Sequence, residues 1–65
     1  MYHVNYFLNG ERLTYNFNFH TAIGAIYKAM AIFTEHGIQS DVMDTTTGEI
    51  IAIFTHEDIY IAQDI

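Results

Sequence analysis

Histidine and acidic side chains are the groups in this chain that could bind a metal ion or move a proton. Among its 65 residues the chain has eight Asp or Glu residues, no Cys and four histidines, His3, His20, His36 and His56. No two histidines stand at the spacing His-x-x-His and no His-Glu-x-x-His motif exists, so no helix face offers two metal ligands. We therefore expect no metal site and no cofactor.

Nucleophilic and acid–base catalysis have no signature in the sequence either. The aliphatic hydroxyl groups belong to Ser40 and seven Thr, and no Gly-x-Ser-x-Gly motif surrounds the serine. The acidic pairs Asp41/Asp44 and Glu57/Asp58 would need a dry cleft to act as acid and base, and a domain of this length has little interior. We therefore expect no enzymatic activity.

The acidic residues are unevenly distributed along the chain. The two acids and two bases of residues 1–40 cancel, so the net charge of −6 resides in residues 41–65, which contain no Lys or Arg. A chain with so few cations cannot neutralise a row of phosphates, which argues against binding to nucleic acid or to an anionic membrane. We expect the acids to engage a basic protein surface, including one that normally holds nucleic acid. They are Asp41, Asp44, Glu49, Glu57, Asp58 and Asp64.

Length and composition predict one domain spanning residues 1–65. Hydrophobic residues make up 51% of the chain, which is generous for a domain that buries only about 60% of its unfolded surface. No apolar run approaches the roughly 20 residues of a membrane-spanning helix, and the N-terminus lacks a signal sequence. The absence of Cys suits a reducing compartment. We expect an unprocessed cytoplasmic protein.

Two hairpins and one helix must position these groups. Asn9-Gly10 predicts a two-residue turn that pairs Leu8 with Glu11, Tyr6 with Leu13, Val4 with Tyr15 and Tyr2 with Phe17. Thr21 and Gly37 are typical of the N-cap and the C-terminal stop of a helix over residues 22–36. Apolar residues cover most of the circumference of this helix, so we expect it to pack on more than one side.

The second half of the chain predicts another hairpin, over residues 40–45 and 49–55. Its register pairs Val42 with Ala52, Met43 with Ile51 and Asp41 with Ile53. The segment 50–54 is apolar on both faces, so we place it inside the sheet, beside the first or the second strand. Residues 56–63 predict a short capped helical turn. The predicted fold is α+β, with the order β-β-α-β-β, a four-stranded antiparallel sheet and one helix on one face.

Apolar side chains in excess of what one small core can hold predict a homodimer. On the open face of the sheet they are Phe7, Met43, Ile51 and Ile53, and on the helix they are Tyr27 and Ala31.

In size, acidity, lack of Cys and simple plan, the chain resembles the small acidic proteins encoded by phages and other mobile elements. That resemblance implies a non-catalytic inhibitor of a host-defence or nucleic-acid-handling enzyme, of the anti-CRISPR kind. One alternative is a homodimeric structural or adaptor protein without an inhibitory role. Another is a small-molecule-binding module or enzyme whose site forms only between subunits, lined by Tyr6, Tyr15, Tyr27 or Tyr60 with a nearby His.

Overall fold

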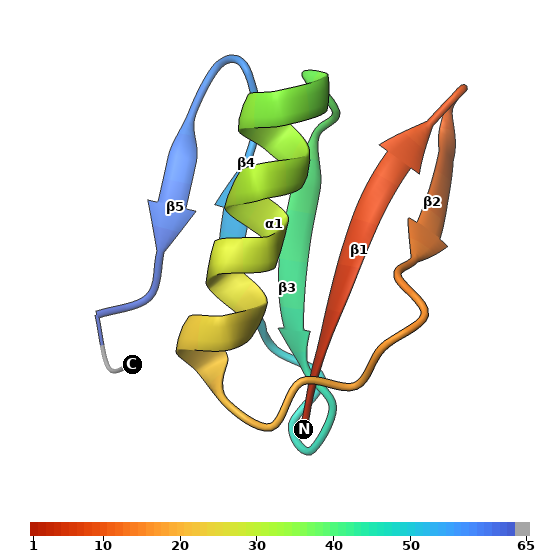
Figure 1. The fold of residues 1–65 in the computed structure, drawn as a ribbon. Helices are drawn as coiled ribbons and strands as arrows, with labels where there is room; N and C mark the ends of the chain where they lie inside the picture. Colours follow the sequence, from red (N-terminus) through yellow and green to blue (C-terminus); the bar gives the residue numbers. More distant parts are fainter. Residues whose placement is uncertain (64–65) are drawn as a thin grey trace.

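A five-stranded antiparallel sheet with one helix on one face forms the structure, a computed structural model that describes residues 1–63 (Figure 1). In chain order the elements are β1 (Tyr2–Leu8), β2 (Glu11–Thr14), α1 (Ala22–His36), β3 (Ser40–Asp44), β4 (Ile50–Phe54) and β5 (Ile59–Ile61). In the sheet the strand order is β2-β1-β3-β4-β5. The predicted α+β class and antiparallel sheet are confirmed, whereas the predicted number of four strands is wrong. No helix within residues 1–63 is long and apolar enough to cross a membrane.

The first hairpin forms around the predicted turn. Asn9 and Gly10 have φ angles of 54° and 83°, as a turn with two left-handed residues requires, and Leu8 pairs with Glu11. The predicted pairing of Tyr2 with Phe17 is wrong. Phe17 N–H donates to the Tyr15 carbonyl over 2.8 Å, and this tight turn shifts the contact of Tyr2 to Phe19.

Helix α1 begins and ends at the predicted residues. The Thr21 hydroxyl accepts a hydrogen bond of 3.1 Å from Gly24 N–H and so caps the first turn. Gly37, at φ 67°, donates its N–H to the Phe33 carbonyl over 2.9 Å and closes the last turn. The left-handed residue turns the chain back toward the sheet, where β3 follows.

The second hairpin lies at a different place in the sheet from the one predicted. Strand β4 is interior, as its two apolar faces indicate, but its neighbours are β3 and β5, while β3 borders β1. The predicted pairs Val42/Ala52 and Asp41/Ile53 are present. A bulge after Val42 makes Met43 pair with Ile50 instead of Ile51.

Strand β5 takes the place of the helical turn predicted for residues 56–63. The hydrogen bond from Asp58 N–H to the Thr55 hydroxyl, 3.0 Å long, has the form of a helix cap, but here it closes a turn between two strands. The Asp58 carbonyl accepts in return from Thr55 N–H over 2.9 Å. Beyond the turn, the β-branched residues Ile59 and Ile61 extend along β4, whose second edge would otherwise lack backbone partners.

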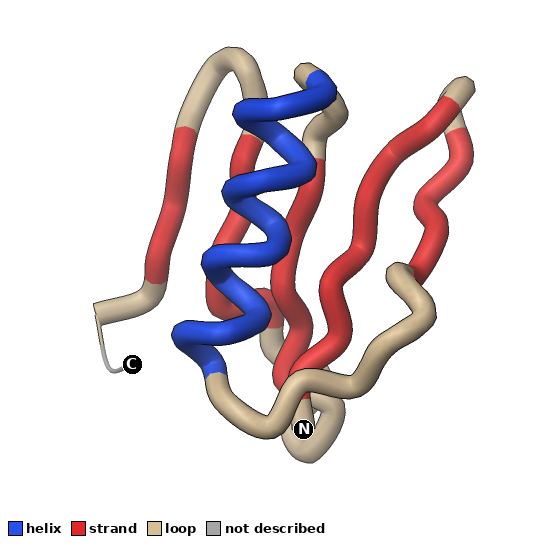
Figure 2. Tube along the Cα trace, viewed as in Figure 1, coloured by secondary structure: helices blue, strands red, loops and turns tan. Residues whose placement is uncertain are grey.

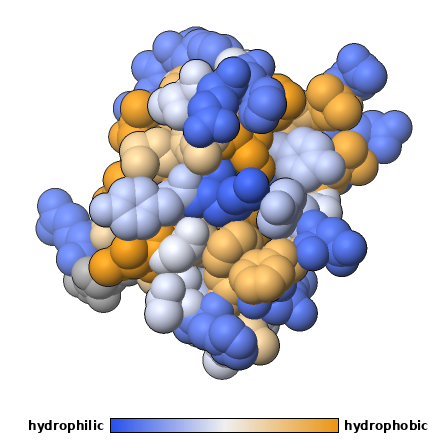
Figure 3. All heavy atoms as spheres, in the orientation of Figure 1, coloured by the Kyte–Doolittle hydropathy of each residue, from blue (hydrophilic) through white to orange (hydrophobic). Residues whose placement is uncertain are grey.

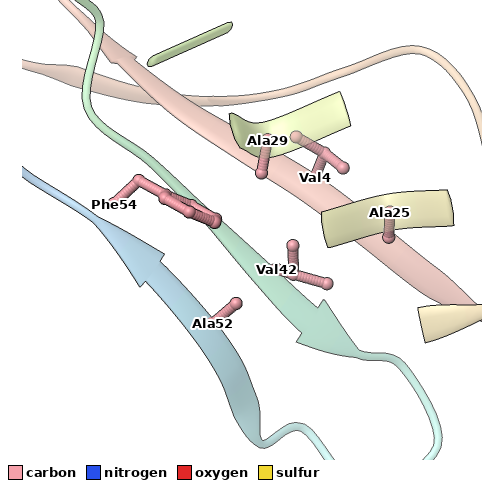
Figure 4. Packing of buried hydrophobic residues seen from close by; sticks show 6 residues of the cluster. All are labelled: Val4, Ala25, Ala29, Val42, Ala52 and Phe54. Atoms are coloured by element: carbon pink, nitrogen blue, oxygen red, sulfur yellow. The ribbon is translucent and has the colours of Figure 1, made fainter. Parts of the chain in front are cut away.

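The core lies between α1 and the central strands (Figure 4). Its buried side chains are mostly small: Val4, Ala25, Ala29, Val42, Ala52 and Phe54. Helix α1 packs on β1 and β3 and more lightly on β4, and its backbone lies farther from β5 in the described part of the chain. Figures 1 and 2 show β5 to the left of the helix, outside its cover.

Candidate functional site

Asp41 is buried on the face of the sheet that points away from α1. It is 6% exposed, and its carboxylate accepts hydrogen bonds from Arg12 over 3.0 and 3.3 Å. Asn5, its partner on the neighbouring strand, donates its side-chain amide to Asp41 Oδ1 over 2.9 Å. Thr14 then donates its hydroxyl to the Asn5 carbonyl oxygen over 2.8 Å. The charge of Asp41 is thus compensated inside the protein.

The remaining predicted acids fall into two groups at opposite ends of β4. Asp44 and Glu49 flank the turn between β3 and β4, whereas Glu57 and Asp58 lie in the turn between β4 and β5 (Figure 1). Glu49, Glu57 and Asp58 are exposed. Asp44 is half-buried and accepts a hydrogen bond from Thr46 N–H over 2.9 Å. Asp64 lies outside the described residues. Within residues 1–63, the exposed acids of this set therefore do not form one continuous row.

The side chains predicted for self-association are divided between the two faces of the molecule. Tyr27 and Ala31 belong to α1, on the helix face of the sheet. Phe7 and Ile53 are exposed, and strand alternation places them on the open face with the half-buried Met43. Ile51, which the bulge leaves unpaired with β3, is half-buried and packs against the core cluster. No single face of the molecule contains the whole predicted set.

A larger apolar surface lies on the helix face, between α1 and β5, and we call it the α1–β5 surface. Tyr27 is 64% exposed and Ile59 is 56% exposed, and Ile23 and Ile61 are similarly open to solvent. Ile23, Tyr27 and Met30 stand at the spacing i, i+4, i+7, which aligns them along one side of the helix. Figure 3 shows apolar atoms gathered on this side of the molecule. The surface comprises Ile23, Ile26, Tyr27, Met30, Phe33, Ile59, Ile61 and Ala62.

Two hollows follow one another along this surface. One of about 330 Å³ lies between the first half of α1 and the end of β5, and its lining is entirely apolar or aromatic. The other, of about 550 Å³, lies at the opposite end, where Phe33 and Ile59 meet the turn that carries Glu57 and Asp58. His56 connects this turn to the helix, because its Nε2 lies 3.0 Å from the Gly37 carbonyl oxygen. We call these two successive hollows together the groove. Its walls are mainly apolar, and Glu57 and Asp58 lie at one end.

The outer edge of β5 is partly closed by its own chain. Thr55 N–H donates to the Asp58 carbonyl, and Ala62 N–H donates to the Ile51 carbonyl. Because hydrogen-bonded and non-hydrogen-bonded pairs alternate in an antiparallel sheet, the backbone N–H and C=O groups of Ile59 and Ile61 point away from β4. Ile59 N–H, however, donates to the Asp58 carboxylate over 2.9 Å. An edge strand with a blocked donor is a poor template for adding another strand.

Two of the four tyrosines predicted for a small-molecule site lie together. Tyr6 and Tyr15 line a hollow of about 230 Å³ with Lys28 and His36. Lys28 Nζ lies 4.6 Å from the centre of the Tyr15 ring, so the ammonium has an aromatic partner within the fold. Tyr27 belongs to the α1–β5 surface, and Tyr60 pairs with Ile53 in the sheet. The tyrosines therefore do not converge on one site.

Sequence reasoning did not identify Ile23, Ile59 and Ile61 as surface residues. Both Ile59 and Ile61 belong to the segment 56–63, for which the sequence predicts a helical turn instead of a strand. The alternation of two isoleucines around Tyr60 is the signal that favours a strand, because β-branched and aromatic residues suit a pleated surface.

Among residues 1–63, no group of three His, Asp or Glu side chains is arranged to hold a metal ion. No protein family, curated protein or solved structure matches this chain.

Proposed function

We propose that this chain is a non-catalytic protein-binding module and that the α1–β5 surface is where it binds. The observation that carries the proposal is the exposure of large apolar side chains from two different elements along one groove. Contiguous apolar patches of this kind mark interaction sites, since isolated soluble domains keep them small. Covering the groove with another protein would release about 25 cal/mol for each Å² of apolar surface removed from water.

The charge of the module favours a basic partner. Glu57 and Asp58 stand exposed at one end of the groove, and no Lys or Arg belongs to its lining. An enzyme that handles nucleic acid, including a host-defence enzyme, offers a basic surface, and we propose an inhibitory role toward a target of this class. Since the described acids stand in separate groups, the proposed docking rests on the apolar groove with a carboxylate end, rather than on imitation of a phosphate row.

Selection from a random-peptide display library tests the proposed surface. The wild-type protein should enrich peptides with apolar and basic residues. Tyr27→Lys should abolish their binding, because it places an ammonium group in the groove. Asn18→Lys, which adds the same charge at an exposed position before the helix, is the control and should bind as the wild type does. Peptides that bind the two variants equally well would contradict the proposal.

A homodimeric adaptor is a second candidate, favoured by the sequence of the edge strand. Ile59-Tyr60-Ile61 reads the same in both directions, so two copies of β5 paired antiparallel about Tyr60 would place each Ile59 opposite an Ile61. The Asp58 carboxylate on Ile59 N–H competes with that pairing. Light scattering across protein concentration distinguishes the candidates, because only the second one requires the mass of two chains.

A further inference from the structure

We infer that the partner docks as an amphipathic helix with Lys or Arg residues near its N-terminus, lying beside α1 and antiparallel to it over β5. This inference rests on the proposed function and names the chemistry of the partner. It concerns the face of the sheet, not its edge.

Helix α1 leaves the β5 side of its sheet face open. Neighbouring strands lie about 4.8 Å apart, and a helix with its side chains is about 10 Å wide, so one helix covers about two strands. Helix α1 packs mainly on β1 and β3. On its other flank, Tyr15 and Phe19 pack against the core and cover that side. Ala52 and Phe54 of β4 are buried, so the part of this face that stays open lies over β5 and along the flank of α1, and a docked helix would rest on both.

The side chains bordering this region suit helix packing. Ile23, Tyr27 and Met30 form a ridge along α1, and ridges of this spacing fit the grooves of a neighbouring helix. Ile59 and Ile61 form the floor, because they point to the helix face of β5. A docked helix would thus meet an apolar wall and an apolar floor, which requires an apolar stripe of its own.

Charge sets the direction of the docked helix. Glu57 and Asp58 lie at the same end of the groove as the C-terminus of α1, since His56 of their turn reaches the Gly37 carbonyl oxygen. The carbonyl groups at a helix C-terminus are the negative end of its dipole. Carboxylates and dipole together favour the positive N-terminal end of a partner helix, and basic side chains near it.

Extended binding at the edge of β5 is less suited to this structure. An added strand would need the outward backbone groups of Ile59 and Ile61. Ile59 N–H already donates to the Asp58 carboxylate over 2.9 Å, so strand addition would first break that hydrogen bond. Docking of a helix on the face leaves it intact.

Three synthetic 18-residue peptides test the inference by fluorescence anisotropy with the full chain. The first has Leu at the spacing i, i+3, i+4, i+7 and Lys on its N-terminal half. The second has Glu in place of each Lys, and the third has the composition of the first in scrambled order. We expect the first to bind at least about tenfold more tightly than either of the others. Equal affinity of the first two peptides would overturn the inference.

A matched pair of variants locates the carboxylate end. Glu57→Lys should weaken binding of the first peptide by about fivefold or more, and raised salt should reduce that difference. Glu49→Lys makes the same change of charge in an exposed turn at the other end of β4, and its affinity should stay within about twofold of the wild type. Circular dichroism checks that both variants are folded. A larger loss from Glu49→Lys than from Glu57→Lys would overturn the assigned direction.

Failure of the inference and failure of the proposed function give different results. If display-selected peptides bind through Tyr27 while no helical peptide binds, the module remains a protein-binding one but the helical partner is wrong. If Tyr27→Lys leaves the binding of every peptide unchanged, the proposed function itself fails. If the protein has the mass of two chains at every concentration and no peptide binds in the groove, the surface belongs to a second copy of the chain, and the inference is overturned.

Discussion

Asp41 carries one of the six carboxylates in the acidic half of the chain, and the fold pairs it with Arg12 across the open face of the sheet. Strand alternation alone predicts that Asp41 and Ile53 share a face. It does not predict that Arg12 and Asn5 reach the carboxylate, because that depends on β3 lying beside β1. The sequence suggests Asp41 for partner binding, but in the fold its carboxylate is bound by Asn5 and Arg12, because the strand order places β3 beside β1.

Replacing Asp41 with Ala should destabilise the protein by about 2–3 kcal/mol. The change leaves the buried Asn5 amide without its acceptor and removes the counter-charge of Arg12. Arg12→Ala should cost less, about 1 kcal/mol, since the Arg12 side chain is 44% exposed and water can replace part of its contact. Urea unfolding of both single variants and of the double variant measures the two costs and their coupling. Equal costs for the two single changes would contradict this account of Asp41.

Phe54 is the largest fully buried side chain, at 1% exposure, and most of its core neighbours are Val or Ala. Phe54→Ala should therefore lower the free energy of unfolding by about 3–5 kcal/mol. A domain of this size has only a few kcal/mol of stability, so we expect circular dichroism to show a largely unfolded chain at 25 °C. Phe54→Leu, which retains most of the apolar contact, should stay folded with a lower midpoint.

At the scale of elements, the end of α1 depends on one backbone conformation. Gly37 has φ 67°, which a residue with Cβ adopts at a cost, and no atom stands within 4 Å of where a Cβ would lie. Gly37→Ala should therefore destabilise by about 1 kcal/mol through the backbone alone, and Gly37→Asn by less, because Asn tolerates the left-handed region. Thermal unfolding of the two variants checks this order. A loss as large for Asn as for Ala would contradict the assignment.

The elements also show how far sequence reasoning reaches. The first turn, both ends of α1 and the interior position of β4 follow from local patterns, namely Asn9-Gly10, the Thr21 and Gly37 caps, and five consecutive apolar residues. Strand β5 does not follow, because Thr55 and Asp58 form the same local hydrogen bond in a helix cap and in this turn. The free edge of β4 decides between the two, and that edge exists only once the sheet has formed. The α1–β5 surface could not be predicted for the same reason.

On the scale of the whole molecule, one helix covers only part of a five-stranded sheet. Apolar side chains of α1 and β5 that border the uncovered part stay exposed. If the α1–β5 surface serves binding rather than folding, polar changes there should hardly affect stability. Tyr27→Lys and Ile59→Lys should each alter the free energy of unfolding by less than about 0.5 kcal/mol. Urea unfolding measures this. A loss of 2 kcal/mol or more, the range for a core substitution, would place these side chains in the core instead.

Isoleucine methyl NMR of the full chain, titrated with the Lys-bearing helical peptide, is the most direct test of the proposed binding surface. The chain offers reporters on both faces, with Ile23, Ile59 and Ile61 in the α1–β5 surface and Ile53 exposed on the open face of the sheet. We predict shifts for the first three methyl groups and an unchanged Ile53 signal. Shifts centred on Ile53, with Ile23 and Ile59 unmoved, would contradict the central claim and assign binding to the opposite face.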